Sequence, residues 1–187
     1  HGPPDATSTL ATAPELPTTS AYGSTTSAHQ KTANDFTISL WFKADATNFA
    51  HHLIWQGESD GNGWGSQNEM HLTLGNRNSG NNYDNRLAFF LGYREASAGN
   101  PLNISYGFSD TGSWHHAAVV VSSMSGAPAA TLYVDGVERG ADTSTTGETA
   151  RGDWNTGFRL GRPAAAERRF DGKMDEVRIA TTNRSVG

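Results

Sequence analysis

The chain has 187 residues, which is the size of one domain and is long enough to bury a substantial core. Its formal net charge of −5 argues against a nucleic-acid ligand, because phosphate binding needs clustered Lys and Arg side chains. No apolar run approaches the roughly 18–20 residues of a membrane span. The absence of cysteine excludes disulfides, zinc–thiolate sites and thiol catalysis, and it favours an exported bacterial protein over a small animal domain.

Residues 1–34 differ in composition from the rest of the chain. They are low in large apolar side chains and rich in Thr, Ser, Ala and Pro. This composition is typical of a linker that arrives from a larger protein, or of an irregular first strand that lies across the fold. Both alternatives stay open, and residues 35–187 are expected to form a single domain.

Alternation with a period of two begins at Phe36. Large apolar residues and other residues alternate through 36–43, which is the pattern of a half-buried strand. Further strands are expected at 51–56, 70–74, 86–93, 102–108, 114–122, 131–134, 158–160 and 173–180. The residues predicted to be buried are Phe36, Ile38, Leu40, Phe42, Leu87, Phe89 and Trp114. Asp135-Gly136, between 132–134 and Val137, predicts a tight hairpin.

Helical periodicity is missing from every segment of about ten residues. Because short alternating strands are separated by turn residues throughout, the predicted fold class is all-β, a sandwich or a barrel.

Five segments, read in order, carry a resemblance to a known family. They are 36–43 (FTISLWFK), 113–119 (SWHHAAV), 132–136 (LYVDG), 158–162 (FRLGR) and 172–179 (GKMDEVRI). In this order the chain resembles the concanavalin A-like lectin and glucanase superfamily, especially its laminin G-like, bacterial pentraxin-like members. The resemblance implies a jelly roll of two antiparallel sheets packed face to face, with loops crowded at one rim. It implies less about activity, because this fold carries lectins, carbohydrate-binding modules, protein-binding modules and hydrolases alike.

Catalytic carboxylates are not evident in the sequence. Glycan-cleaving enzymes of this superfamily commonly carry Glu-x-Asp-x-Glu on one strand, which points all three side chains into a cleft as the nucleophile and the acid/base pair need. The nearest segment, 58–62 (ESDGN), ends in Asn and lies in a Gly-rich loop. The sequence therefore favours a domain that does not catalyse a reaction.

Four of the seven histidines form two adjacent pairs, His51-His52 and His115-His116. Neighbours on a strand point to opposite faces, so neither pair can chelate a metal as a pair. We expect His116 to be a packed structural side chain in a buried strand.

Calcium is the cofactor that the chain is expected to hold, because flexible loops supply the carboxylate, amide and carbonyl oxygens that it takes. The resemblance implies Asp175 as a structural ligand. Asp60 and Asn62, with Glu58 and Glu69 nearby, form a second cluster of oxygen ligands. Asp and Asn are also common in ordinary turns, and the sequence leaves that alternative open.

Sugar recognition needs flat aromatic faces flanked by planar polar groups. Trp64, Tyr83 and Trp154 lie in Gly- and Asn-rich segments without a packing pattern, and loop aromatics of this kind are typical of binding sites. The hydrogen-bonding partners expected beside them are Asn68, Asn82, Arg77 and Arg86. The alternative is that the loop tryptophans fold back as lids over the core. Trp41 is expected on the strand face opposite the core residues, and Trp55 in the core.

These observations predict a non-catalytic glycan-binding module of a larger secreted or cell-surface protein, with a polysaccharide as its partner. The rival interpretation is a protein-interaction or structural domain of a surface adhesin, which a flat apolar patch would favour. An enzyme would need clustered carboxylates or an Arg-His-Tyr set in a groove.

Overall fold

The computed structural model describes residues 23–24, 35–48, 51–57, 69–77, 83–92, 102–123, 127–143, 158–161 and 169–180. All regular structure in these residues is β-strand, as the sequence predicts, and none of them belongs to a helix that could span a membrane. The strands are β1 Gly23–Ser24, β2 Phe36–Ala44, β3 His51–Gly57, β4 Glu69–Arg77, β5 Tyr83–Leu91, β6 Leu102–Gly107, β7 His115–Ser122, β8 Ala129–Val134, β9 Val137–Thr143, β10 Arg159–Leu160 and β11 Gly172–Ala180.

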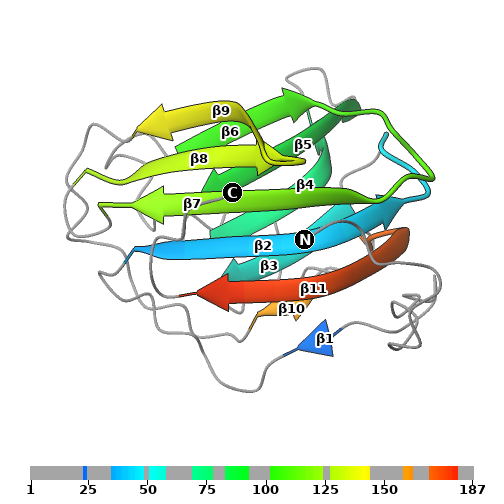
Figure 1. The fold of residues 1–187 in the computed structure, drawn as a ribbon, viewed down its shortest axis with the longest axis horizontal. Helices are drawn as coiled ribbons and strands as arrows, with labels where there is room; N and C mark the ends of the chain where they lie inside the picture. Colours follow the sequence, from blue (N-terminus) through cyan, green and yellow to red (C-terminus); the bar gives the residue numbers. More distant parts are fainter. Residues whose placement is uncertain are drawn as a thin grey trace.

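Two antiparallel sheets are stacked face to face (Figure 1). The five-stranded sheet has the order β11-β2-β7-β8-β9, and the six-stranded sheet has the order β1-β10-β3-β4-β5-β6. Strands β6 and β9, at the edges of different sheets, lie at the same side of the sandwich (Figure 1). This layering is the jelly-roll sandwich that the sequence predicts.

The inward faces of the two sheets form one apolar core. Ile38, Leu40 and Phe42 of β2 are at most 1% exposed, and Leu87 and Phe89 of β5 are fully buried. Alternation with a period of two explains this set, because every second side chain of a strand points to the same face. The predicted burial is therefore confirmed for these five residues.

Two of the predicted core residues are not fully buried. Phe36, the first residue of β2, is only partly covered. Trp114 is also partly exposed. It precedes β7 and, like His116, points outward, whereas Ala117 and Val119 point into the core. The apolar residues around Trp114 therefore indicated more burial than this side chain has.

The turn between β8 and β9 is the tight hairpin that Asp135-Gly136 predicts. Both residues have positive φ angles, 54° and 76°, as a two-residue turn of this hand requires. The turn holds Asp135 against the start of β7, where its backbone N–H donates to the carbonyl of His116 at 2.8 Å.

Candidate functional site

The outward face of the six-stranded sheet carries two rows of side chains that cross the strands. Register places one row, which we call the planar row, across β10, β3, β4, β5 and β6. Its members are Arg159, Trp55, His71, Phe90 and Asn103. The second row, which we call the small row, consists of His52, Thr73, Ala88 and Ser105.

A bulge in β3 sets this arrangement. The register shifts between His52 and Ile54, so that Leu53 and Ile54 both belong to the core. Strand alternation then returns Trp55 to the outward face. Trp55 is buried, as expected, but it packs outside the core that the two sheets share.

Contacts between flat groups connect the planar row. The Arg159 guanidinium carbon lies 5.3 Å from the centroid of the Trp55 ring, which is cation–π geometry. His71 stacks on Phe90 with ring centroids 4.9 Å apart and planes inclined by 14°. His52 meets His71 edge to face at 5.3 Å.

From β3 to β6, exposure increases along both rows, while Arg159 at the β10 end is partly exposed. Trp55 and His52 are fully buried, His71 is 4% exposed, and Phe90 is partly exposed. Asn103 and Ser105, at the ends of the two rows, are exposed. The face therefore presents part of an aromatic ring next to an amide and a hydroxyl.

Charged groups extend this open end toward the start of β5. The Arg86 Nη1 donates to Ser105 Oγ at 3.1 Å, and Arg86 Nε lies 3.5 Å from Asp84 Oδ2. The side chains of Arg86 and Asp84 are 45% and 40% exposed. Gly107 lies opposite Arg86 in the register, and a Cβ at Gly107 would meet nothing within 4 Å.

The hydroxyl of Thr73, in the small row, is buried without a hydrogen-bond partner. The Thr73 side chain is fully buried beside Ala88. Groups of this kind are uncommon in folded proteins, because their lost hydration is not replaced. The hydroxyl faces the same side of the sheet as Ser105.

The structure describes only some of the predicted ligand-binding residues. Arg86 is exposed on the outward face, and the backbones of Arg77 and Tyr83 are register partners at the β4–β5 end nearby. The remaining predicted residues, Trp64, Trp154, Asn68 and Asn82, lie outside the described residues, as do the side chains of Arg77 and Tyr83. The loop part of the site thus stays a prediction.

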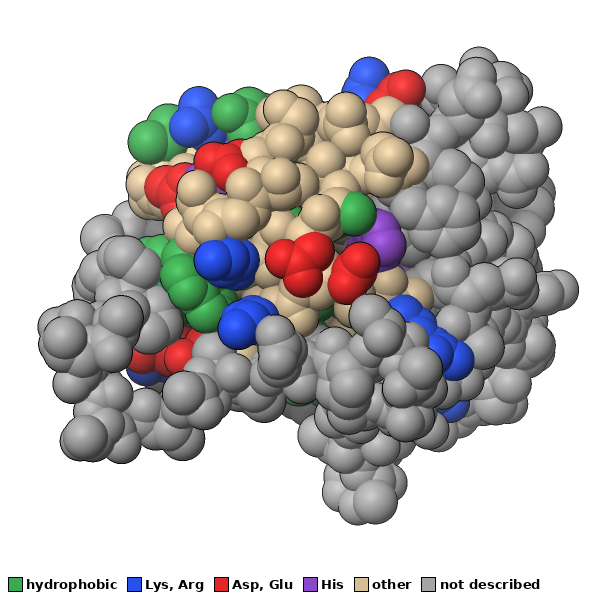
Figure 2. All heavy atoms as spheres, turned by 90° about the vertical axis from the view of Figure 1, so that its right-hand side faces the viewer, with side chains coloured by type: hydrophobic (Ala, Val, Ile, Leu, Met, Phe, Trp, Pro, Cys, Tyr) green, Lys and Arg blue, Asp and Glu red, His purple; other side chains and the backbone are tan. Residues whose placement is uncertain are grey.

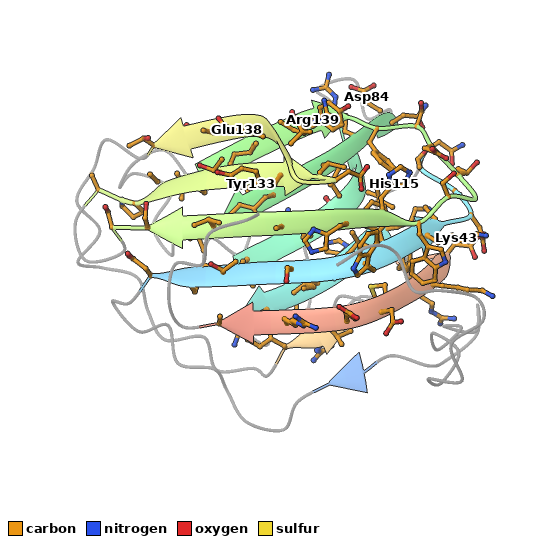
Figure 3. All side chains as sticks on the ribbon, viewed as in Figure 1. Lys43, Asp84, His115, Tyr133, Glu138 and Arg139 are labelled. Atoms are coloured by element: carbon orange, nitrogen blue, oxygen red, sulfur yellow. The ribbon has the colours of Figure 1, made fainter. Side chains whose placement is uncertain are left out.

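A second polar cluster lies at the end of the sandwich where β7 begins. His115 places Nδ1 2.8 Å from Asp135 Oδ2 and Nε2 3.1 Å from Asp110 Oδ2, and the Phe108 ring meets its edge at 4.9 Å. Figure 3 shows His115 at this end, and Figure 2 shows acidic and basic side chains gathered there around a histidine. The two carboxylates link the β6–β7 connection and the β8–β9 turn to β7.

Asp175, the predicted calcium ligand, lies on β11 opposite Trp41. Its Oδ1 accepts a hydrogen bond of 2.8 Å from the backbone N–H of Glu176, which has a φ of 48° at the bulge of β11. In the part of the chain that the structure describes, no three His, Asp or Glu side chains converge to hold a metal ion. Asp60 and Asn62 lie outside the described residues. Calcium stays a prediction.

The outward face of the five-stranded sheet carries Trp41, on the strand face that the sequence predicts. Trp41 is 7% exposed and lies beside His116, with ring centroids 5.2 Å apart and planes inclined by 51°. His116 packs beside the Trp41 ring and is partly exposed. Burial lowers its pKa, and the nearby Asp135 carboxylate opposes that shift.

Comparisons with known proteins agree with this architecture. A family model described as the concanavalin A-like lectin/glucanases superfamily matches residues 17–186. No curated protein matches the sequence.

Several solved structures share the fold. Domain 4 of AbnA, an extracellular arabinanase from Geobacillus stearothermophilus in complex with arabinotriose, is 19% identical with a TM-score of 0.53, and the match covers 82% of this chain and 63% of that one. The CBM40 module of Ruminococcus gnavus IT-sialidase, bound to α2,3-sialyllactose, is 13% identical with a TM-score of 0.62 over 82% of this chain and 79% of that one. Domains LG4-5 of the mouse laminin α1 chain are 15% identical with a TM-score of 0.55, over 87% of this chain and 39% of that one.

Proposed function

Because the chain belongs to the concanavalin A-like lectin/glucanase superfamily, we propose that it is a non-catalytic carbohydrate-binding module of a larger exported bacterial protein. Its ligand is a polysaccharide or another glycan. The module acts outside the cell, either secreted or at the cell surface. Similar folds in an extracellular arabinanase and in a sialidase module support this setting.

The observation that carries the proposal is the planar row with its exposed end. Sugar rings present C–H faces that pack on aromatic rings, while their hydroxyls bond to planar amide and guanidinium groups. Phe90, Asn103 and Arg86 supply these three kinds of group on one open face. Trp64, Tyr83 and Trp154, with Asn68, Asn82 and Arg77, are the loop residues that we propose to complete the site.

The experiment compares partly exposed aromatic residues on the two outward faces. Phe90→Ala removes the exposed ring of the planar row and should weaken glycan binding by about 1–3 kcal/mol, the scale of one buried aromatic side chain. Tyr133→Ala is the matched control, since Tyr133 is partly exposed on the five-stranded sheet (Figure 3). A glycan array followed by calorimetry measures both. Binding that survives Phe90→Ala but not Tyr133→Ala, or an array without any bound glycan, would refute the proposal.

A loop variant tests the rest of the site. Trp64 lies between glycines, so Trp64→Ala should weaken glycan binding by about 1–3 kcal/mol and leave the melting temperature nearly unchanged. A large loss of stability would instead identify Trp64 as a lid over the core.

The rival function, protein interaction, has less support from the described surface. Within the described ranges, Val137, at 51%, is the one large apolar side chain that is exposed. A protein-binding face would need a contiguous apolar patch, so the polar and aromatic face favours a glycan. Incubation of the protein with its bound polysaccharide tests the non-catalytic part of the proposal, and new reducing ends would contradict it.

Calcium remains part of the proposal on sequence grounds. If an ion binds at Asp175 or at Asp60 and Asn62, chelation should lower the melting temperature, because a ligand of the native state stabilises it by mass action. Asp175→Ala should then remove the effect of the chelator. If chelation leaves the melting temperature of calcium-loaded protein unchanged, calcium does not stabilise the fold.

A further inference from the structure

We propose that Asp84, Arg86 and Ser105 select neutral glycans with adjacent hydroxyl groups over glycans that carry carboxylate or sulfate. This inference rests on the proposed function, because it names the ligand class of the same site. The three side chains lie at the open end of the outward face of the six-stranded sheet.

The cluster places a hydrogen-bond acceptor (Asp84), a donor (Arg86) and a hydroxyl (Ser105) side by side. Arg86 lies between the other two, with Nε 3.5 Å from Asp84 Oδ2 and Nη1 3.1 Å from Ser105 Oγ. These contacts hold the guanidinium in one orientation while nearly half of the side chain faces solvent. A guanidinium carries five N–H donors, so it can bind a ligand oxygen besides these two partners.

The surface beside Arg86 has room for a ligand. Gly107 occupies the neighbouring register position on β6, and a Cβ there would meet nothing within 4 Å. Its φ lies outside the left-handed region, so the backbone does not require glycine. The missing side chain therefore leaves open space next to the exposed guanidinium.

The charge of the cluster favours an uncharged ligand. An anionic group that approaches Arg86 also approaches Asp84, and like charges at such short range repel. The chain as a whole carries a net charge of −5, which adds to that repulsion at low salt. Two adjacent sugar hydroxyls, in contrast, can donate to the carboxylate and accept from the guanidinium at the same time, and such charge-assisted hydrogen bonds are the stronger ones.

The distance to the aromatic end of the site argues for an oligosaccharide. Arg86 and Phe90 are four residues apart on β5, which corresponds to about 13 Å between their backbones. Ser105 and Asn103 are two residues apart on β6, which corresponds to about 7 Å, so neighbouring sugars of one chain can reach both parts of the site. A chain of neutral sugars can place one ring on Phe90 and Asn103 and a neighbouring ring on the charged cluster.

The test uses the full chain on an array that holds arabinotriose, lactose and other neutral oligosaccharides beside sialyllactose, uronate and sulfated glycans. We expect the bound set to be neutral. Asp84→Asn keeps the shape of the side chain and removes its charge, so it should weaken neutral glycan binding by about 10-fold and strengthen the binding of acidic glycans. Glu138→Gln changes the net charge equally on the other sheet, and it should alter neither class.

A second pair of variants tests the space beside Arg86. Gly107→Phe should fill it and reduce binding of the neutral glycans far more than Gly107→Ala does, with melting temperatures as the check on folding. Preferential binding of acidic glycans by the unaltered protein, or tighter binding of every glycan by Asp84→Asn, overturns the inference while the carbohydrate-binding function stands. If the array retains no glycan, the proposed function fails and this inference fails with it.

Discussion

The two outward faces of the sandwich contain similar tryptophan pairs in different surroundings. On the five-stranded sheet, the Trp41 ring lies 5.2 Å from the ring of His116, and on the six-stranded sheet the Trp55 ring lies 5.3 Å from the guanidinium of Arg159. Both tryptophans are buried, at 7% and 0% exposure. Each of them is a packed side chain, so a tryptophan on a sheet face does not by itself mark a binding site.

The residues around each pair make the difference. The Trp41 pair shares its row with Asp175, and Lys43 lies opposite Lys173 in the next outward position, so charges surround it. The planar row around Trp55 instead continues through stacked rings to the partly exposed Phe90 and the exposed Asn103. From Trp55 toward Asn103, the planar side chains change from buried to exposed, and this change distinguishes the face that we assign to glycan binding.

The largest effect that we expect is the loss of stability when Trp55 is removed. If Trp55→Ala had no effect, the two outward faces would not differ as described. Trp55→Ala should destabilise the domain by about 3–5 kcal/mol, because it leaves a cavity under a fully buried side chain. Trp114→Ala should cost clearly less, since Trp114 is partly exposed and precedes its strand. Urea unfolding of both variants measures the difference, and equal costs would contradict the packing described here.

Much of the fold could be predicted from local sequence patterns. Alternation identified β2 almost to the residue, and Asp135-Gly136 located the β8–β9 turn. Only the start of strand β9 was predicted, from the Asp135-Gly136 hairpin, because VERGADT at Val137–Thr143 has no alternating apolar set, and the strand lies at a sheet edge with mostly exposed residues. An edge strand without a buried face carries no alternating apolar pattern, whereas the edge strands β6 and β11 each bury residues on one face and were predicted.

The planar row could not be predicted, because it exists only through register. Arg159 and Trp55 are more than a hundred positions apart in the chain and become neighbours through β10 and β3. The bulge at Leu53 also reverses the face that simple alternation assigns to Trp55. Arg86 was predicted from its polar surroundings, whereas Phe90 was missed because its neighbours Phe89 and Leu91 are core residues.

A smaller effect is expected in the small row. Thr73→Val replaces a buried hydroxyl that has no hydrogen-bond partner with a methyl group of similar size, so it should stabilise the protein by about 1 kcal/mol. Thr47→Val is the matched control, because the Thr47 hydroxyl is buried and donates to Asn85 Oδ1 at 2.9 Å. That variant should lose about 1 kcal/mol. Urea titrations that show both variants shifted in the same direction would contradict this reasoning.

The smallest expected effect concerns the five-stranded face and depends on pH. Burial lowers the pKa of His116 below its ordinary value of about 6.5, although Asp135 opposes the shift. The unfolded chain therefore takes up a proton before the folded protein does, so this residue lowers stability as pH falls through about 6.5 and has no further effect below its folded pKa. His116→Phe keeps a ring beside Trp41 without a titrating group and should lose less stability over that interval. Unfolding free energies measured from neutral to mildly acidic pH test this, and curves that run parallel for the two proteins would show that His116 does not contribute.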